Sequence, residues 1–182
     1  MTLHYDDTQK IELLKSKKFI LSKDTLIFYL KTIKKITNIY FNKCIYQTNF
    51  TYDDNCISPI PWQLGHIIDF YLKYTLYFIK KIKNTFHYSI LESYIIQFEK
   101  AHNIKFNLFF DSDRTSYIYR NTIQLDSYRL KIIYNSIIKI LISFIHINSL
   151  TSSLTYLIML SILHNDMHNE NFIFSYYNII NQ

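Results

Sequence analysis

The sequence has few of the residues that interrupt or cross-link a chain: one glycine, two prolines and two cysteines among 182 residues. Cys44 and Cys56 are not spaced as a CxxC pair, so free thiols in a reducing cytoplasm are expected. Residues 1–10 are polar and do not resemble a signal peptide. No apolar run reaches the roughly 18 residues of a membrane span. The nearest, residues 150–163, contains Thr and Ser and favours a buried helix. We therefore expect a cytoplasmic protein that does not enter the membrane.

The positive charge gives little support for nucleic-acid binding, although the formal net charge is +6. All but three of the twenty basic residues are lysines, and they are scattered through helix-like segments, as on a solvated surface. Nearly half of the residues are apolar, with 17 Tyr and 14 Phe, which argues against a disordered chain. We expect a single domain over residues 1–182, of which residues 1–20 form an N-terminal extension.

Hydrophobic periodicity predicts an all-α protein with four long helices. The second is expected to begin at Pro61, because proline is well tolerated in the first turn of a helix. A shorter helix near residue 89 and an irregular stretch at residues 102–124 would form a long connection between the second and third long helices. Such a pattern predicts a four-helix bundle. The long helices are expected at about residues 24–41, 61–83 and 126–144, and from near residue 149 or 151 to beyond residue 170.

Three histidines are placed where such a bundle could bring them together. His164 and His168 are one helical turn apart and therefore point the same way. His66 falls in the second turn of the second long helix. Three neutral imidazoles can bind Zn, Fe, Ni or Cu and leave coordination positions open for a substrate or water. Because imidazole must be neutral to bind, we expect metal affinity to fall below about pH 6.5.

The histidine pattern by itself leaves alternatives open. An HxxxH pair also occurs by chance, and a histidine near a helix start is commonly a capping or core residue. Asn165 stands where the HExxH motif of metalloproteases has glutamate, which argues against that class. We interpret the remaining histidines as ordinary surface or core residues: His4, His87, His102 and His146.

Two segments resemble a known family. Residues 58–66, SPIPWQLGH, resemble the segment that opens the second helix of the DinB-like domain in ergothioneine- and ovothiol-type sulfoxide synthases. Residues 164–170, HNDMHNE, are similar to that family's second motif. These synthases are non-heme iron enzymes that join thiols to histidine derivatives with O2. The resemblance implies a DinB-like four-helix bundle in which His66, His164 and His168 bind Fe(II), with Zn or Ni as alternatives. It also implies that Glu170 supports the ligands without binding the metal.

The resemblance extends over about residues 24–174, with a less specific middle section. In the ergothioneine branch, arginines of the connecting loop hold carboxylates of the thiol co-substrate, and the nearest candidates here are Arg114 and Arg120. A loop arginine paired with a neighbouring aspartate, such as Asp111 or Asp113, is the alternative interpretation. Asn165 departs from the family, in which glutamate is common at this position.

The family's second domain, which resembles formylglycine-generating enzymes, has no counterpart in these residues. The resemblance implies that the chain, if it is active, is an iron-dependent oxidoreductase that forms a carbon–sulfur bond with O2 and takes a thiol small molecule. Because that second domain is missing from these residues, activity would require a partner domain or subunit. The alternatives are a stand-alone metal-dependent thiol transferase or hydrolase, and a non-catalytic helical bundle.

Overall fold

The computed structural model describes residues 21–45, 58–82 and 87–180, and this part of the chain is all-α, without a strand. The expected N-terminal extension, His4 and Cys56 lie outside the described residues. The helices are α2 (Lys23–Ile45), α3 (Ile60–Phe70), the π-helix η1 (Tyr71–Leu76), α4 (Tyr77–Ile82), α5 (His87–His102), α6 (Phe106–Phe109), α7 (Tyr117–Arg120), α8 (Ser127–Ile147) and α9 (Ser152–Ile180).

The second long helix begins where proline predicts. Pro59 is its N-cap residue in an extended conformation, and Pro61 occupies the first turn, where its missing N–H costs no helical hydrogen bond. The helix then continues through α3, η1 and α4 without a break. Hydrophobic periodicity did not predict the π-helical turn, which shifts the register of the buried face in the middle of the helix.

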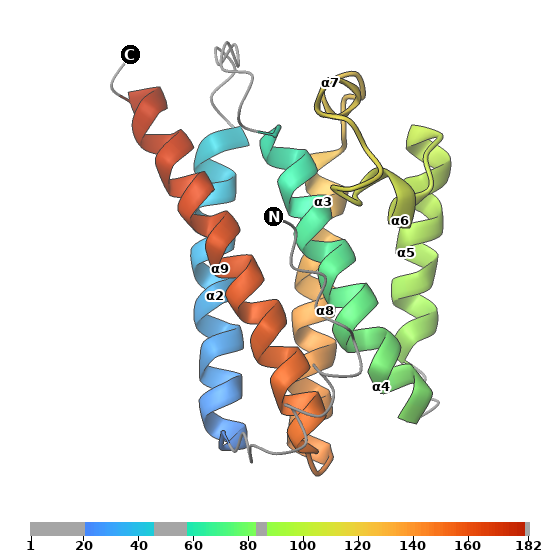
Figure 1. The fold of residues 1–182 in the computed structure, drawn as a ribbon, viewed down its shortest axis with the longest axis vertical. Coiled ribbons are helices and arrows are strands. Elements are labelled where there is room, and N and C mark those ends of the chain that lie inside the picture. The colour runs from blue at the N-terminus through green and yellow to red at the C-terminus, as the bar shows by residue number, and fades with distance from the viewer. Residues whose placement is uncertain (1–20, 46–57, 83–86, 181–182) are drawn as a thin grey trace, which may run out of the picture.

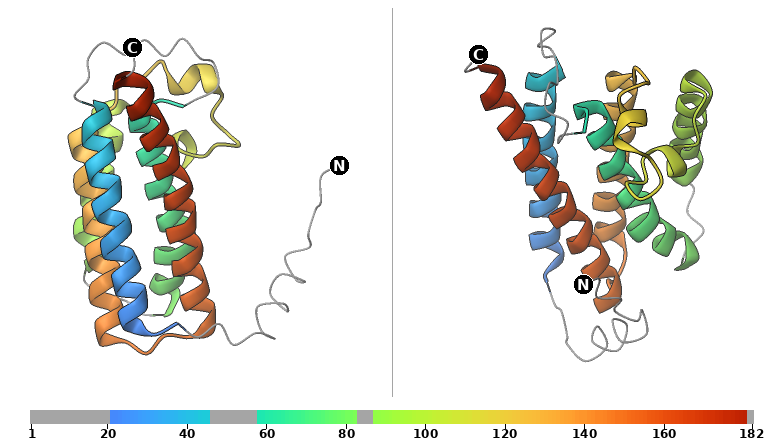
Figure 2. Two further views of the ribbon diagram at one scale, coloured as in Figure 1. Left: turned by 90° about the vertical axis from the view of Figure 1, so that its left-hand side faces the viewer. Right: turned by 45° about the horizontal axis from the view of Figure 1, so that its top comes forward.

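The long helices pack lengthwise against one another (Figure 1). Helix α2 contacts α9, α8 and α3, while α3 contacts both α8 and α9. Figure 2 shows the same four segments side by side after a quarter turn. Helix α5 packs on the outer side of α8. Residues 103–126, here called the connecting segment, carry α6 and α7 and lie beside the first half of α3 (Figure 1).

The core consists of the apolar stripes that these helices turn towards one another. Leu30, Ile67, Ile137 and Leu141 are completely buried, and each such side chain contributes about 1.5–3 kcal/mol relative to exposure. Among the described helices, α8 is long and apolar enough to cross a membrane by length and composition alone. It contacts α2, α3 and α5, as the central helix of a packed core does.

Candidate metal centre

His66, His164 and His168 come together between α3 and α9. One potential ligand atom from each side chain lies within 4.8 Å of the other two, and the ring centroids are 4.8–5.2 Å apart. An ion held at about 2.0–2.1 Å from each nitrogen would place the nitrogens about 3.0–3.5 Å apart. The group could therefore hold a metal ion if the three imidazoles moved closer together.

The connecting segment fixes the orientation of His66. Nδ1 of His66 lies 2.7 Å from the main-chain oxygen of Phe110. Because a carbonyl can only accept, Nδ1 carries the proton and Nε2 keeps its lone pair. The indole of Trp62 stacks on the same imidazole, with centroids 5.2 Å apart, and its Nε1 donates to the main-chain oxygen of Phe109. Two successive carbonyls thus bind two side chains one helical turn apart on α3.

A glutamine orients His168. Its Nδ1 lies 3.2 Å from Oε1 of Gln63, and only 8% of the residue is exposed. The other ring nitrogen, Nε2, is buried and has no hydrogen-bond partner among the described residues. An orphaned buried polar atom of this kind costs about 1–3 kcal/mol. A bound metal ion would give that nitrogen a partner.

His164 is held by an aromatic ring rather than by a hydrogen bond. Its imidazole stacks on Phe70, with centroids 3.8 Å apart and planes 9° from parallel. Nδ1 of His164 is buried and, within the described part of the chain, has no partner. The site therefore contains two unpaired imidazole nitrogens, one on each histidine of α9.

Burial keeps the three imidazoles neutral. Loss of hydration, reinforced by the neighbouring His66 ring, lowers the pKa of His164 to about 4. Burial, with the neighbouring His164 and His66 rings, lowers the pKa of His168 to about 3. The pKa of His66 is also lowered, mainly by burial. All three are thus in the metal-binding form at neutral pH.

A group of charges lies close to His66. Lys73 forms ion pairs of 2.8 Å with both Asp69 and Asp111, joining η1 to α3 and to the connecting segment. Burial raises the pKa of Asp69, although Lys73 opposes that effect. Asp69 favours a positive charge on His66, whereas Arg120 and Lys73 oppose one. Among the described residues, none of these charged groups forms a hydrogen bond or an ion pair with the three imidazoles.

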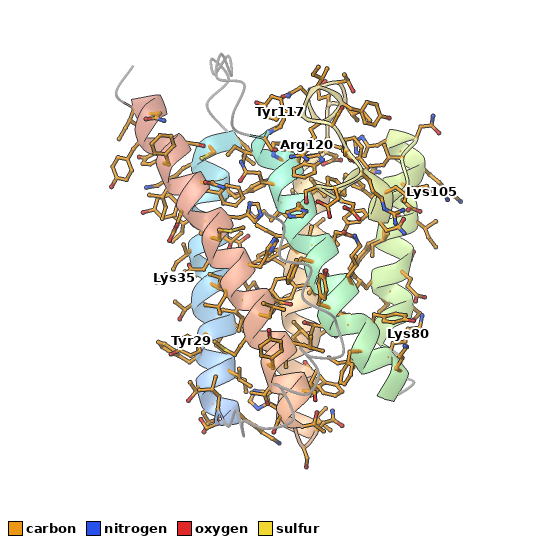
Figure 3. All side chains as sticks on the ribbon, viewed as in Figure 1. Tyr29, Lys35, Lys80, Lys105, Tyr117 and Arg120 are labelled. Atoms are coloured by element: carbon orange, nitrogen blue, oxygen red, sulfur yellow. The ribbon has the colours of Figure 1, made fainter. Side chains whose placement is uncertain are left out.

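The two arginines predicted to bind substrate lie in the connecting segment and make local contacts there. Arg114 is largely exposed, and its Nε lies 3.5 Å from a carboxylate oxygen of Asp111. This contact is the pairing of a loop arginine with a neighbouring aspartate that the alternative interpretation describes. Arg120 donates to the main-chain oxygens of Ser112 and Thr115 and to the hydroxyl of Ser58. Its guanidinium also lies 4.0 Å from the centroid of the Trp62 ring. Figure 3 shows Arg120 near the N-terminal end of α3.

Glu170 lies on the exposed side of α9, and the described residues show no hydrogen bond from it to the three histidines. Sequence reasoning missed the groups that do contact the imidazoles, namely the amide of Gln63 and the main chain of Phe110. One signal for Gln63 was available, because it is a polar residue three positions before His66 in an otherwise apolar turn. A backbone carbonyl leaves no such signal.

Asn165 belongs to a buried polar network between α2, α8 and α9. Its Oδ1 accepts from the hydroxyl of Tyr134 at 2.8 Å, and its Nδ2 donates to Thr37 at 3.0 Å. Thr37 also bonds Oδ1 of Asn169 at 2.9 Å. Asn165 and Asn169 each follow one of the α9 histidines, so the network fixes the rotation of α9 that presents those imidazoles to His66.

The comparisons with known proteins assign no family. The chain matches no protein-family model, and no curated protein is significantly similar to it in sequence. The described structure is helical, with a buried group of three histidines that could hold a metal ion.

Proposed function

We propose that this protein binds a divalent transition-metal ion through His66, His164 and His168. The observation that carries the proposal is the convergence of three neutral imidazoles with two buried nitrogens left unpaired. Imidazole suits Zn, Cu, Fe and Ni. Three neutral ligands would leave the ion its full charge and open positions, which suit the binding of a thiolate.

Metal analysis tests this proposal. Protein purified without oxygen is expected to contain a stoichiometric metal ion, and His164→Ala and His168→Ala are each expected to lose most of it. His146→Ala is the matched control, because His146 is an exposed histidine on α8, away from the cluster. Unchanged metal content in the His164→Ala/His168→Ala double variant would overturn the site.

The identity of the metal and the reaction belong to the same proposal. We propose Fe(II), a DinB-like four-helix bundle, and a role equivalent to the N-terminal half of a sulfoxide synthase. The support is the resemblance of residues 58–66 and 164–170 to that family's motifs, together with the convergence of the histidines those motifs contain. A partner domain or subunit resembling formylglycine-generating enzymes would supply the other wall of the active site.

The reaction is tested with the chain loaded with Fe(II) under anaerobic conditions. O2, cysteine or γ-glutamylcysteine, and a trimethylated histidine are then added, and mass spectrometry is used to search for a sulfoxide product. We expect product only when a formylglycine-generating-enzyme-like partner is present, because misplacement of a reacting group by about 1 Å can cost roughly a hundredfold in rate. Product from the chain alone would refute the need for a partner. Metal binding without product in either mixture would refute the assignment to sulfoxide synthesis.

A further inference from the structure

The side chain of Gln63 is almost completely buried and makes a hydrogen bond at each end. It is 2% exposed. Its Nε2 donates to the main-chain oxygen of Ser58 at 2.7 Å, and its Oε1 lies 3.2 Å from Nδ1 of His168. Asn171 also donates to this Oε1, at a longer 3.4 Å. Because the Ser58 carbonyl can only accept, the amide has one possible orientation, with its oxygen towards His168.

That orientation determines the tautomer of His168. An amide oxygen is an acceptor, so the proton of the neutral imidazole must be on Nδ1, and the lone pair must be on Nε2. Nε2 is the nitrogen that is buried and unpartnered among the described residues. We propose that Gln63 is a positioning residue for the metal: it holds His168 in the tautomer and ring orientation that present Nε2 to the ion. This inference rests on the metal-binding function proposed above.

The connecting segment in turn holds Gln63 through Ser58. The Ser58 hydroxyl accepts a hydrogen bond of 2.8 Å from Arg120, whose other nitrogens bind main-chain oxygens of the connecting segment. Arg120, Ser58, Gln63 and His168 therefore form one continuous series of hydrogen bonds from the loop to the imidazole. This series gives Arg120 a structural role that does not require a substrate.

A neutral partner also has a consequence for the charge of the site. Metal-bound histidines are often hydrogen-bonded to a carboxylate, which raises the basicity of the ligand. Gln63 accepts the same hydrogen bond without adding a negative charge. The three ligands and their hydrogen-bond acceptors, Gln63 and the Phe110 carbonyl, are all neutral, so the site favours an anionic exogenous ligand at the open positions.

The direct test is the tautomer of His168, measured by two-bond 1H–15N NMR on metal-free protein, with His168→Ala used to assign the signals. We expect wild-type His168 to be protonated at Nδ1, and Gln63→Leu to shift it towards protonation at Nε2. In metal titrations, Gln63→Leu is expected to weaken affinity about 10–100-fold. Asn171→Ala is the matched control, because it removes the second donor to Oε1 and leaves the acceptor of His168 in place.

The outcomes separate this inference from the proposed function. Protonation of wild-type His168 at Nε2 would overturn the inference whatever the variants do, including a Gln63→Leu protein that fails to fold. The inference would also be overturned if Gln63→Leu and the more similar Gln63→Met both bound metal as tightly as the wild type. Circular dichroism would have to show that both variants have the native fold. A wild-type protein with the Nδ1 tautomer and no metal affinity would instead refute the proposed function.

Discussion

Gly65 and Phe110 are in direct contact, and the contact leaves no room for a side chain on the glycine. A Cβ atom at Gly65 would overlap the aromatic ring of Phe110. Phe110 is completely buried and packs against Trp62, Phe98 and Phe106. The only glycine of the chain therefore lets the connecting segment approach α3 closely enough for the Phe110 carbonyl to reach His66.

Gly65→Ala is predicted to destabilise the protein. Alanine favours a helix over glycine by about 1 kcal/mol, but overpacking a core that cannot relax costs about 1–3 kcal/mol. Since the Phe110 ring is surrounded by other aromatic rings, we expect the overlap to dominate. Urea unfolding should show a net loss of stability, and metal affinity should fall because the Phe110 carbonyl moves away from His66.

Phe110→Leu provides the matched test of that mechanism. If the Cβ overlap is the cause, Gly65→Ala should cost less in the Phe110→Leu background than in the wild type, giving a favourable coupling energy in a double-mutant cycle. Strict additivity would show that the Phe110 ring is not what excludes the side chain.

The pH dependence of metal binding should differ from that expected for a metal site made of three exposed histidines. Because burial lowers the pKa of His164 to about 4 and that of His168 to about 3, protons compete with the metal for these two ligands only in strongly acidic solution. The pKa of His66 is also lowered, so we expect metal affinity to fall only below the pH of about 6.5 at which ordinary histidines become protonated. Titrations of Zn²⁺ or Co²⁺ across this range test the prediction. A midpoint near 6.5, as expected from the sequence alone, would show that the imidazoles are hydrated in solution.

The same pKa values predict how the metal-free protein responds to acid. The ordinary histidine pKa of about 6.5 applies to the unfolded chain, so between that pH and about 3 the unfolded state binds more protons than the folded state. Stability is therefore present above pH 6.5 and is lost as the pH falls through this window. Thermal unfolding at a series of pH values should show the decline. A His164→Ala/His168→Ala variant should show a smaller decline.

The first and third long helices were predictable because each has one apolar stripe at helical spacing, and the start of the second was predictable from its prolines. The π-helical turn at Tyr71–Leu76 was not, because an extra residue in one turn changes the register without changing composition. The convergence of the histidines followed from the spacing of His164 and His168 and the placement of His66 on a facing helix. Their hydrogen-bond partners did not follow, because the connecting segment has no hydrophobic period from which its path could be inferred.

The two candidate arginines should behave differently when replaced. Arg120→Ala removes three hydrogen bonds of the connecting segment and the contact with Trp62, so we expect a stability loss of about 1–3 kcal/mol and faster proteolysis of that segment. Arg114→Ala removes an exposed ion pair with Asp111, which is worth about 0–1 kcal/mol. Chemical denaturation of both variants measures the two losses of stability. Equal effects would contradict the structural role of Arg120. Loss of thiol affinity in stable Arg114→Ala protein would support the substrate-binding interpretation.

Thr37→Val tests whether the buried polar network holds α9 in the rotation that the site requires. Valine has nearly the same shape as threonine, but it removes the hydroxyl to which Tyr134, Asn165 and Asn169 are bonded. Those buried groups would lose a partner, so we expect a cost of about 1–3 kcal/mol and a weaker metal affinity. Thr32→Val is the matched control, because Thr32 is an exposed residue of the same helix and its replacement should change stability by less than about 0.5 kcal/mol. Metal at a hundred times its dissociation constant should then stabilise the Thr37→Val protein by about 2.7 kcal/mol, since binding favours the folded state.

Equal stability and equal metal affinity in the two variants would show that packing alone orients His164 and His168.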